Sequence, residues 1–441
     1  MQKIVNEGLG KLLALAFTTL LLSACGGSDT TIIEKDPIVI DDDHDDDHDH
    51  DHESAGRLLV SDKDSAQVSV IDLTEKTVLD QFVTTAIPSA IYASPGKRYG
   101  VVIQRTDDRV DTIDGGLWQE DHGDHMHGYN AAPMFMAFHT TESRPTHFTG
   151  TATQSVIFYD GNVDTATPAA VGVFTEADIT NNTGGIWLHY TTHMHGAAQA
   201  RGEYLLTTER EADAPTTLPD RVALYHAHND HFDQELVFAE TCPGLHGSAQ
   251  NHEFIAFGCT DGVLVVEQDG DTFIDSKILN PDTFTDTTRI GTLVGDANLD
   301  IFVGIAAEQF YVVDPESASV TPIIWTGAEV TAIGYGFAEA GEWFVILDNQ
   351  GKLTILSVAD WSIANTVQAI TSNIAALPTG SRFELAFSAG HEVFVSDPIA
   401  NQIKVIDLDA AEVADTIQLD FTPHKFTWLG IAESASDDHD H

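Results

Sequence analysis

The chain has 441 residues, with 69 Asp plus Glu against 20 Lys plus Arg and a formal net charge of -49. This charge would repel phosphates, which excludes nucleic acid as a partner, and it attracts cations. A general need for solubility explains part of the same charge equally well.

The first 24 residues are predicted to be a lipoprotein-type signal peptide. Lys3 and Lys11 precede an apolar run at 12–22, which is too short for a comfortable transmembrane helix. The tetrad LSAC ending at Cys25 resembles a bacterial lipobox, which implies cleavage before Cys25 and lipid attachment to its thiol. An ordinary secretory signal is the alternative. We therefore expect a periplasmic protein held to a membrane by a lipid anchor.

Residues 25–55 are predicted to be a disordered, metal-binding tether rich in Asp and His. The run at 41–53 reads DDDHDDDHDHDHE and holds His44, His48, His50 and His52. Imidazole nitrogens among carboxylates suit zinc, nickel or copper at neutral pH. Ordering a loose chain opposes binding, so its affinity should be modest. The acidic, His-containing tail at 432–441 repeats the pattern, and a purely solubilising role is the alternative.

Residues 56–431 are predicted to form an all-β propeller. Short β-branched runs alternate with Gly, Asp, Asn and Pro, and a three-strand unit recurs as RLLVSD-KDSA-QVSVIDL-TEK-TVLDQF and EVFVSD-PIAN-QIKVIDL-DAAE-VADTIQL. A fourth, inner strand recurs every 40 to 57 residues, which matches four-stranded blades. Its eight copies lie near Ala90, His147, His195, His246, Thr292, Ile333, Leu385 and Phe426. We expect eight blades, with seven as the alternative, and a closing blade built from both chain ends.

An insertion at 114–133 interrupts the second blade and reads DGGLWQEDHGDHMHGYNAAP. A long loop inside a compact domain is more often functional than accidental. It holds His122, Asp124, His125 and His127 and precedes the blade of His147. We expect it to fold over the end of the ring to which the aligned histidines point.

Three histidines occupy the same place in three successive repeats, namely His147, His195 and His246. Because inner strands of neighbouring blades converge on one axis, the three imidazoles should meet at one mouth of the channel. Three imidazoles in an acidic protein indicate a zinc-type site. A single histidine there would more often be an ordinary hydrogen-bonded residue.

The fourth ligand is expected from the insertion. We favour His125 or His127, with Asp124 as the alternative and His122 beside them. His193 lies two residues before His195, and in an extended strand the two side chains would share one face.

Cys242 and Cys259 flank the repeat of His246. In an oxidising compartment the simplest prediction is a disulfide, which would contribute about 3 kcal/mol by the chain-entropy model. The alternative is a pair of thiolate metal ligands.

Two further histidine positions are weaker candidates. The loop HAHNDH holds His226, His228, Asp230 and His231 on the outer part of its blade, as a possible secondary site. His424 begins the closing inner strand, but it is expected to face across the ring. The sequence contains no GxSxG, HExxH or glycine-rich phosphate loop, so catalysis has little support.

Taken together, the export signal, the Asp/His-rich segment, the propeller pattern and the motifs HGDHMHG and THMHG resemble periplasmic zinc metallochaperones of the AztD type. The resemblance implies a protein that is not an enzyme, with zinc as the stored metal and the solute-binding protein of a zinc ABC importer as acceptor. The lipobox and the acidic C-terminal tail depart from that family. A metal-dependent, lactonase-like propeller hydrolase and a propeller interaction platform are the alternatives.

Overall fold

The computed structural model describes residues 56–122, 126–285, 288–326 and 330–431. The predicted signal peptide, Cys25, the tether histidines, the tail at 432–441, Asp124 and His125 lie outside these residues. The chain divides into two units, Met1–Ile32 and Ile33–His441, and every described residue belongs to the second. Within the described ranges, no helix is both long and apolar enough to cross a membrane.

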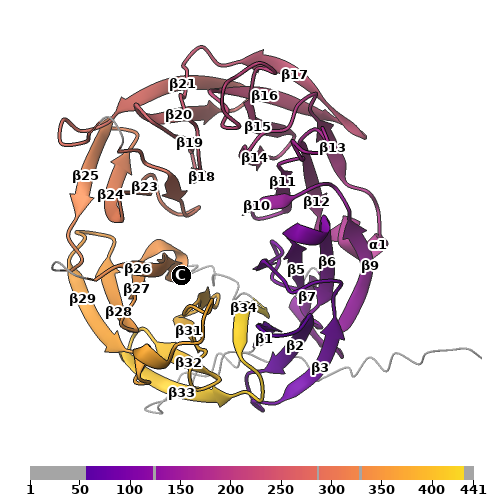
Figure 1. Cartoon of the computed structure of the whole chain (residues 1–441), viewed down its shortest axis with the longest axis vertical. Coiled ribbons are helices and arrows are strands. Elements are labelled where there is room, and N and C mark those ends of the chain that lie inside the picture. Colours follow the sequence, from indigo (N-terminus) through magenta and orange to yellow (C-terminus); the bar gives the residue numbers. More distant parts are fainter. Residues whose placement is uncertain (1–55, 123–125, 286–287, 327–329, 432–441) are drawn as a thin grey trace, which may run out of the picture. The chain divides into compact units, whose positions relative to one another are not determined.

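The described residues form eight four-stranded blades around a central axis (Figure 1). Six blades are separate sheets. The other two share one eight-stranded sheet, because their outer strands β13 (Ile186–His189) and β17 (His231–Val237) pair in parallel at Trp187 and His231. The predicted all-β propeller of eight blades is confirmed, and the seven-bladed alternative is wrong.

From the inner to the outer strand, the first four blades are β34 (Pro423–Gly430), β1 (Gly56–Asp62), β2 (Gln67–Asp72) and β3 (Val78–Val83); β4 (Ala90–Ala93), β5 (Tyr99–Gln104), β6 (Arg109–Asp114) and β9 (Met134–Thr140); β10 (Pro145–Gly150), β11 (Gln154–Tyr159), β12 (Ala170–Thr175) and β13; and β14 (Ala198–Arg201), β15 (Tyr204–Glu209), β16 (Arg221–His228) and β17. The last four are β18 (Ser248–Gln250), β19 (Phe254–Cys259), β20 (Gly262–Asp269) and β21 (Thr272–Leu279); β22 (Thr292–Val294), β23 (Phe302–Ala306), β24 (Gln309–Asp314) and β25 (Ser319–Ile323); β26 (Ala332–Ala338), β27 (Trp343–Asp348), β28 (Lys352–Ser357) and β29 (Ile363–Gln368); and β30 (Leu385–Phe387), β31 (Glu392–Asp397), β32 (Gln402–Asp407) and β33 (Glu412–Gln418).

The remaining elements are the hairpin of β7 (Leu117–Asp121) and β8 (Met126–Asn130), the helix α1 (Glu176–Asn181), and the 3-10 turns η1 (Arg105–Asp107), η2 (Glu339–Gly341) and η3 (Ile374–Ala376).

The two ends of the described chain close the ring in one blade. β34 pairs antiparallel with β1, with Gly56 opposite Gly430 and Val60 opposite Phe426. Buried side chains of β1 and β34, such as Trp428, pack against Phe394 of the last blade. Burial of apolar surface between neighbouring blades therefore holds the ring shut, as it does between the other blades.

The direction of each strand determines the end of the ring at which the loop after it lies. We call the end where inner strands begin, marked by Pro145 and Pro423, the entry end; the end where they finish, marked by Gly150 and Gly430, is the exit end. Because neighbouring strands are antiparallel, the first and third strands of a blade run the same way. Loops after the first or third strand therefore lie at the exit end.

Candidate metal centre

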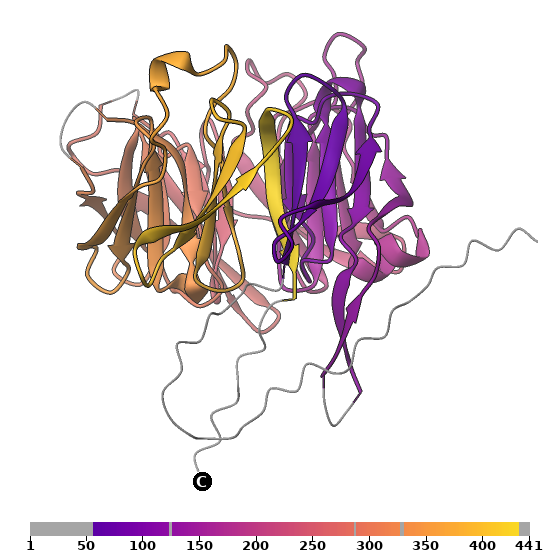
Figure 2. The same cartoon turned by 90° about the horizontal axis from the view of Figure 1, so that it is seen from below.

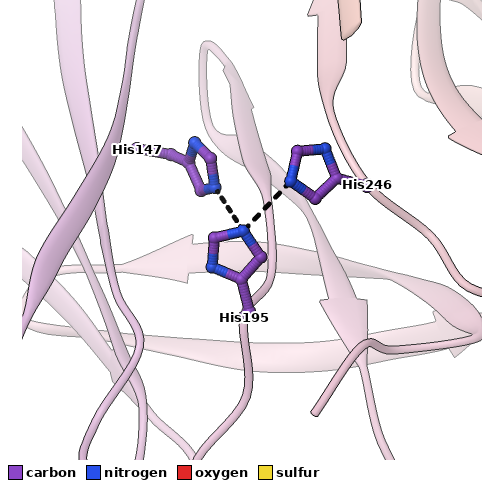
Figure 3. Close-up of side chains that lie close together, drawn as sticks. All are labelled: His147, His195 and His246. Carbon is purple, nitrogen blue, oxygen red and sulfur yellow. Dashed lines mark hydrogen bonds between the residues drawn. The ribbon is translucent and has the colours of Figure 1, made fainter. Parts of the chain in front are cut away.

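The three aligned histidines meet at the entry end. His147 lies near the start of β10, and His195 and His246 lie a few residues before β14 and β18. Figure 3 shows the three rings turned toward one another. The Nε2 atom of His195 lies 3.3 Å from Nε2 of His147 and 3.2 Å from Nε2 of His246. One ligand nitrogen from each lies within 4.8 Å of the other two.

The outer nitrogens of two of these rings have partners that determine where their protons sit. His246 Nδ1 lies 2.6 Å from the carbonyl oxygen of Gly291, and that oxygen can only accept a hydrogen bond. His195 Nδ1 lies 3.0 Å from Oδ2 of Asp160, which accepts in the same way. Both Nδ1 atoms therefore carry a proton, which leaves Nε2 of each ring, when the ring is neutral, with a lone pair directed at the centre.

Two lone pairs 3.2 Å apart repel each other unless a proton or a metal ion lies between them. Burial lowers the pKa of His147 to about 4 and also lowers that of His246, with His195 adding to both shifts. A proton on His147 or on His246 is thus disfavoured at neutral pH. Zinc–nitrogen bonds of about 2.0–2.1 Å in a tetrahedron place two nitrogens roughly 3.3 Å apart. The two separations from His195 Nε2, 3.3 Å and 3.2 Å, match this value, so the donor set fits zinc.

A buried carboxylate orients the middle histidine. Asp160 follows β11, and its Oδ2 accepts hydrogen bonds from His195 and, at 2.9 Å, from Nη2 of Arg105 in the neighbouring blade. Burial raises the pKa of Asp160, but hydrogen bonds from His195 and Arg105 outweigh burial, and the net pKa is lowered. A carboxylate behind a histidine is the usual outer partner in metal sites.

The partner residues Asp160, Arg105 and Gly291 were not predicted. Asp160 and Arg105 each stand one position past a strand that finishes at the entry end. This pattern identifies them as neighbours of the three histidines only once the direction and order of the strands in each blade are known.

His193 does not join this group of three histidines. It and His195 precede β14 in a segment that is not a strand, so the expectation of a shared strand face is wrong. The carbonyl oxygen of His193 instead accepts a hydrogen bond from Nη1 of Arg210 at 3.3 Å.

The insertion at 114–133 does not cover the three histidines, which corrects the sequence-based expectation. It follows β6, the third strand of its blade, and therefore leaves the ring at the exit end. Gly128 lies beside the side chain of Ile431, just after β34, and Figure 2 shows the hairpin projecting on that side. The inner strand β34 runs from the entry end to the exit end and has eight residues. At about 3.3 Å per residue it spans roughly 25 Å, which separates the two ends of the ring.

The described histidines of the hairpin contact each other instead. The rings of His122 and His127 have centroids 5.3 Å apart, and His122 Nε2 lies 3.4 Å from the hydroxyl of Tyr129. Asp124 and His125, the other predicted ligands of this loop, lie outside the described residues. The described strands β7 and β8 lie at the exit end, away from His195.

The two weaker candidates also lie apart from the centre. His226, His228 and His231 stand on β16 and β17 at the exit end, where His228 Nε2 lies 3.5 Å from Oδ2 of Asp233. His424 stands at the entry end, where burial and then Lys425 lower its pKa. Neither position belongs to a described group of three ligand atoms within 4.8 Å of one another.

A disulfide encloses the loop of His246. Cys242 and Cys259 are both fully buried, with an S–S distance of 2.03 Å and their Cα atoms 4.9 Å apart. The bond joins the segment after β17 to the end of β19, and so links two neighbouring blades. As a disulfide, the pair cannot supply thiolate ligands.

No family model matches the chain. The zinc chaperone AztD of Citrobacter koseri is 22% identical over 392 residues, which cover 88% of this chain and 90% of that protein. The structure of apo AztD from the same organism has a TM-score of 0.72 and 21% identity, covering 86% of this chain and 99% of that one. The chain is similar to AztD in sequence and in fold.

A second AztD crystal structure gives the same TM-score of 0.72 at 22% identity and the same coverage. The dihydro-heme d1 dehydrogenase NirN is less similar, with a TM-score of 0.56 and 11% identity over 84% of this chain and 74% of that one. The predicted resemblance to the AztD type is confirmed, and it extends over most of the described ring.

Proposed function

We propose that this chain is a zinc metallochaperone of the cell envelope, which holds Zn²⁺ on His147, His195 and His246. The observation that carries the proposal is the convergence of three Nε2 atoms, two of which direct lone pairs at each other across 3.2 Å. The similarity to the zinc chaperone AztD supplies zinc as the cargo.

The coordination number supports transfer to an acceptor. Three imidazoles leave one position of a tetrahedral zinc shell open. The side chain of His195 is 28% exposed, so that position is reachable from the entry end. A ligand from an acceptor protein binds there first, and the histidines are then released one at a time. We propose the solute-binding protein of a zinc ABC importer as the acceptor.

The parts outside the described residues complete the proposal. The Asp/His-rich segment at 25–55 captures zinc weakly, and a lipid on Cys25 holds the protein in the periplasm. The run DDDHDDDHDHDHE at 41–53 supports the first role, and the tetrad LSAC ending at Cys25 supports the second.

The test is a transfer experiment with a trap. The full chain is loaded with one equivalent of Zn²⁺ and mixed either with the metal-free solute-binding protein or with an excess of chelator. We expect zinc to reach the acceptor faster than it escapes to the chelator, because the acceptor binds before zinc leaves. Equal rates would mean that zinc simply dissociates, and would refute delivery by direct contact.

One observation favours a second candidate, a metal-dependent hydrolase. The described residues bring no fourth ligand to the three histidines, so a zinc-bound water could be activated there. The zinc-loaded chain should then turn over lactones or esters, and His195→Ala should abolish the turnover. We expect no turnover.

A further inference from the structure

A second group of metal-ligand side chains lies at the opposite end of the ring. Glu339 in η2, His391 before β31 and Asp409 after β32 each offer one ligand atom, and these atoms lie within 4.8 Å of one another. Glu339 and His391 follow inner strands, and Asp409 follows a third strand, so all three lie at the exit end. They come from two neighbouring blades.

One oxygen of Glu339 has no partner. Its Oε2 accepts a hydrogen bond from Nε1 of Trp343 at 2.9 Å, which fixes the orientation of the carboxylate. Its Oε1 is buried and has no hydrogen-bond partner among the described residues. A buried acceptor left without a partner is destabilising, and more so when it is charged. A bound cation would remove this cost.

The other two residues leave room for an ion and a path for its entry. His391 Nδ1 lies 3.7 Å from Oδ2 of Asp409, which is longer than a hydrogen bond. The side chain of Asp409 is 65% exposed and that of His391 33% exposed, so the group opens to solvent on one side. Two carboxylates and a neutral imidazole balance the charge of one divalent cation.

We infer that Glu339, His391 and Asp409 form a second divalent-cation site. Its two oxygens and one nitrogen make a harder donor set than three imidazoles, yet one that zinc accepts. It binds more weakly than the histidine group, because the exposed Asp409 side chain must be ordered on binding.

The position of this site suggests why a second one exists. Gly56 follows the Asp/His-rich segment at 25–55 in the chain, and it pairs with Gly430 at the exit end. The hairpin of β7 and β8 leaves the ring at the same end. The second site therefore holds an ion on the side of the ring where that segment is attached. The inference depends only on its own three residues and stands apart from the proposed function.

The first test is crystallographic. Crystals of the full chain are grown with excess Zn²⁺, and anomalous difference density is measured at the zinc absorption edge. We expect a peak bounded by Glu339 Oε1, His391 and Asp409, in addition to one at the three histidines. Density at the histidines alone would overturn the second site, whereas density at Glu339 alone would overturn the proposed function and leave this site intact.

The second test is a zinc titration in a variant that lacks the histidine group. In that background, H391A/D409N should weaken the strongest remaining zinc-binding step by at least about tenfold. Glu339→Gln should do the same while keeping an acceptor for Trp343. Unchanged affinity in both variants would refute the site.

A matched control comes from the corresponding loop of another blade. H252A/E253Q also removes one histidine and one carboxylate at the exit end, where Nδ1 of His252 lies 4.0 Å from Oε1 of Glu253. It should leave the titration unchanged. An equal loss in this variant would show that general surface charge, and not a built site, holds the ion.

Discussion

Asp160→Asn tests whether the carboxylate behind His195 supports metal binding. The substitution keeps the shape of the side chain but removes its charge, so the bond from His195 Nδ1 loses its charge-assisted character, and Arg105 loses its ionic partner. If the new amide turns its NH2 toward His195, it also favours the proton on the wrong ring nitrogen. Outer partners of this kind are worth about 10- to 100-fold in metal affinity, or roughly 1.4–2.8 kcal/mol.

The assay is competition for Zn²⁺ against a chromophoric chelator at pH 7. We expect the zinc affinity of Asp160→Asn to fall at least about tenfold. Asp164→Asn is the matched control, since Asp164 is 81% exposed and lies 3.8 Å from Arg144; it should bind zinc like the unmodified chain. If Asp160→Asn binds zinc within about twofold of the unmodified chain, the role assigned to Asp160 is wrong.

Three further predictions follow from the fold. Replacing Cys242 and Cys259 by serine should lower the free energy of unfolding in urea by about 3 kcal/mol, and a change below about 1 kcal/mol would contradict the chain-entropy argument. H122A/H127A should leave the tightest zinc-binding step in calorimetry unchanged, because the described hairpin lies at the exit end; a lost step would place the hairpin in the site after all. Phe344 is fully buried between two blades, so Phe344→Ala should destabilise the chain by about 3–5 kcal/mol in thermal or urea unfolding, and an unchanged midpoint would argue against that packing.

The three central histidines could be found from the sequence, because the repeats show which positions are equivalent even when the pairing of the strands is unknown. Each lies at or just before the start of the inner strand of its own blade, at separations of 48 and 51 residues along the chain. Equivalent positions of neighbouring blades converge by symmetry, so no long-range contact had to be known. The same repetition predicted that β34 and β1 would share a closing blade.

The insertion was misplaced because nearness in sequence to His147 says nothing about the end of the ring. Strand direction decides that point: a loop after the third strand of a blade leaves at the exit end, away from a residue at the start of the next inner strand. Counting strands within the second blade would have shown this.

The partners of the histidines and the second cluster could not be predicted, because they depend on contacts between blades. Asp160 meets His195 only when two neighbouring blades pack at a particular rotation. Glu339 and His391 lie in equivalent loops of neighbouring blades but not at equivalent positions, and Asp409 lies in a different kind of loop. Only the coordinates bring such residues together.

Calorimetry of Zn²⁺ binding to the metal-free full chain and to a variant without the three central imidazoles decides where zinc is held. We expect H147A/H195A/H246A to lose the tightest binding step and to keep only weaker ones. A matched variant that removes three clustered histidines elsewhere, H226A/H228A/H231A, should retain the tightest step. A tight step that persists in H147A/H195A/H246A would show that zinc is held somewhere else and not on these three histidines.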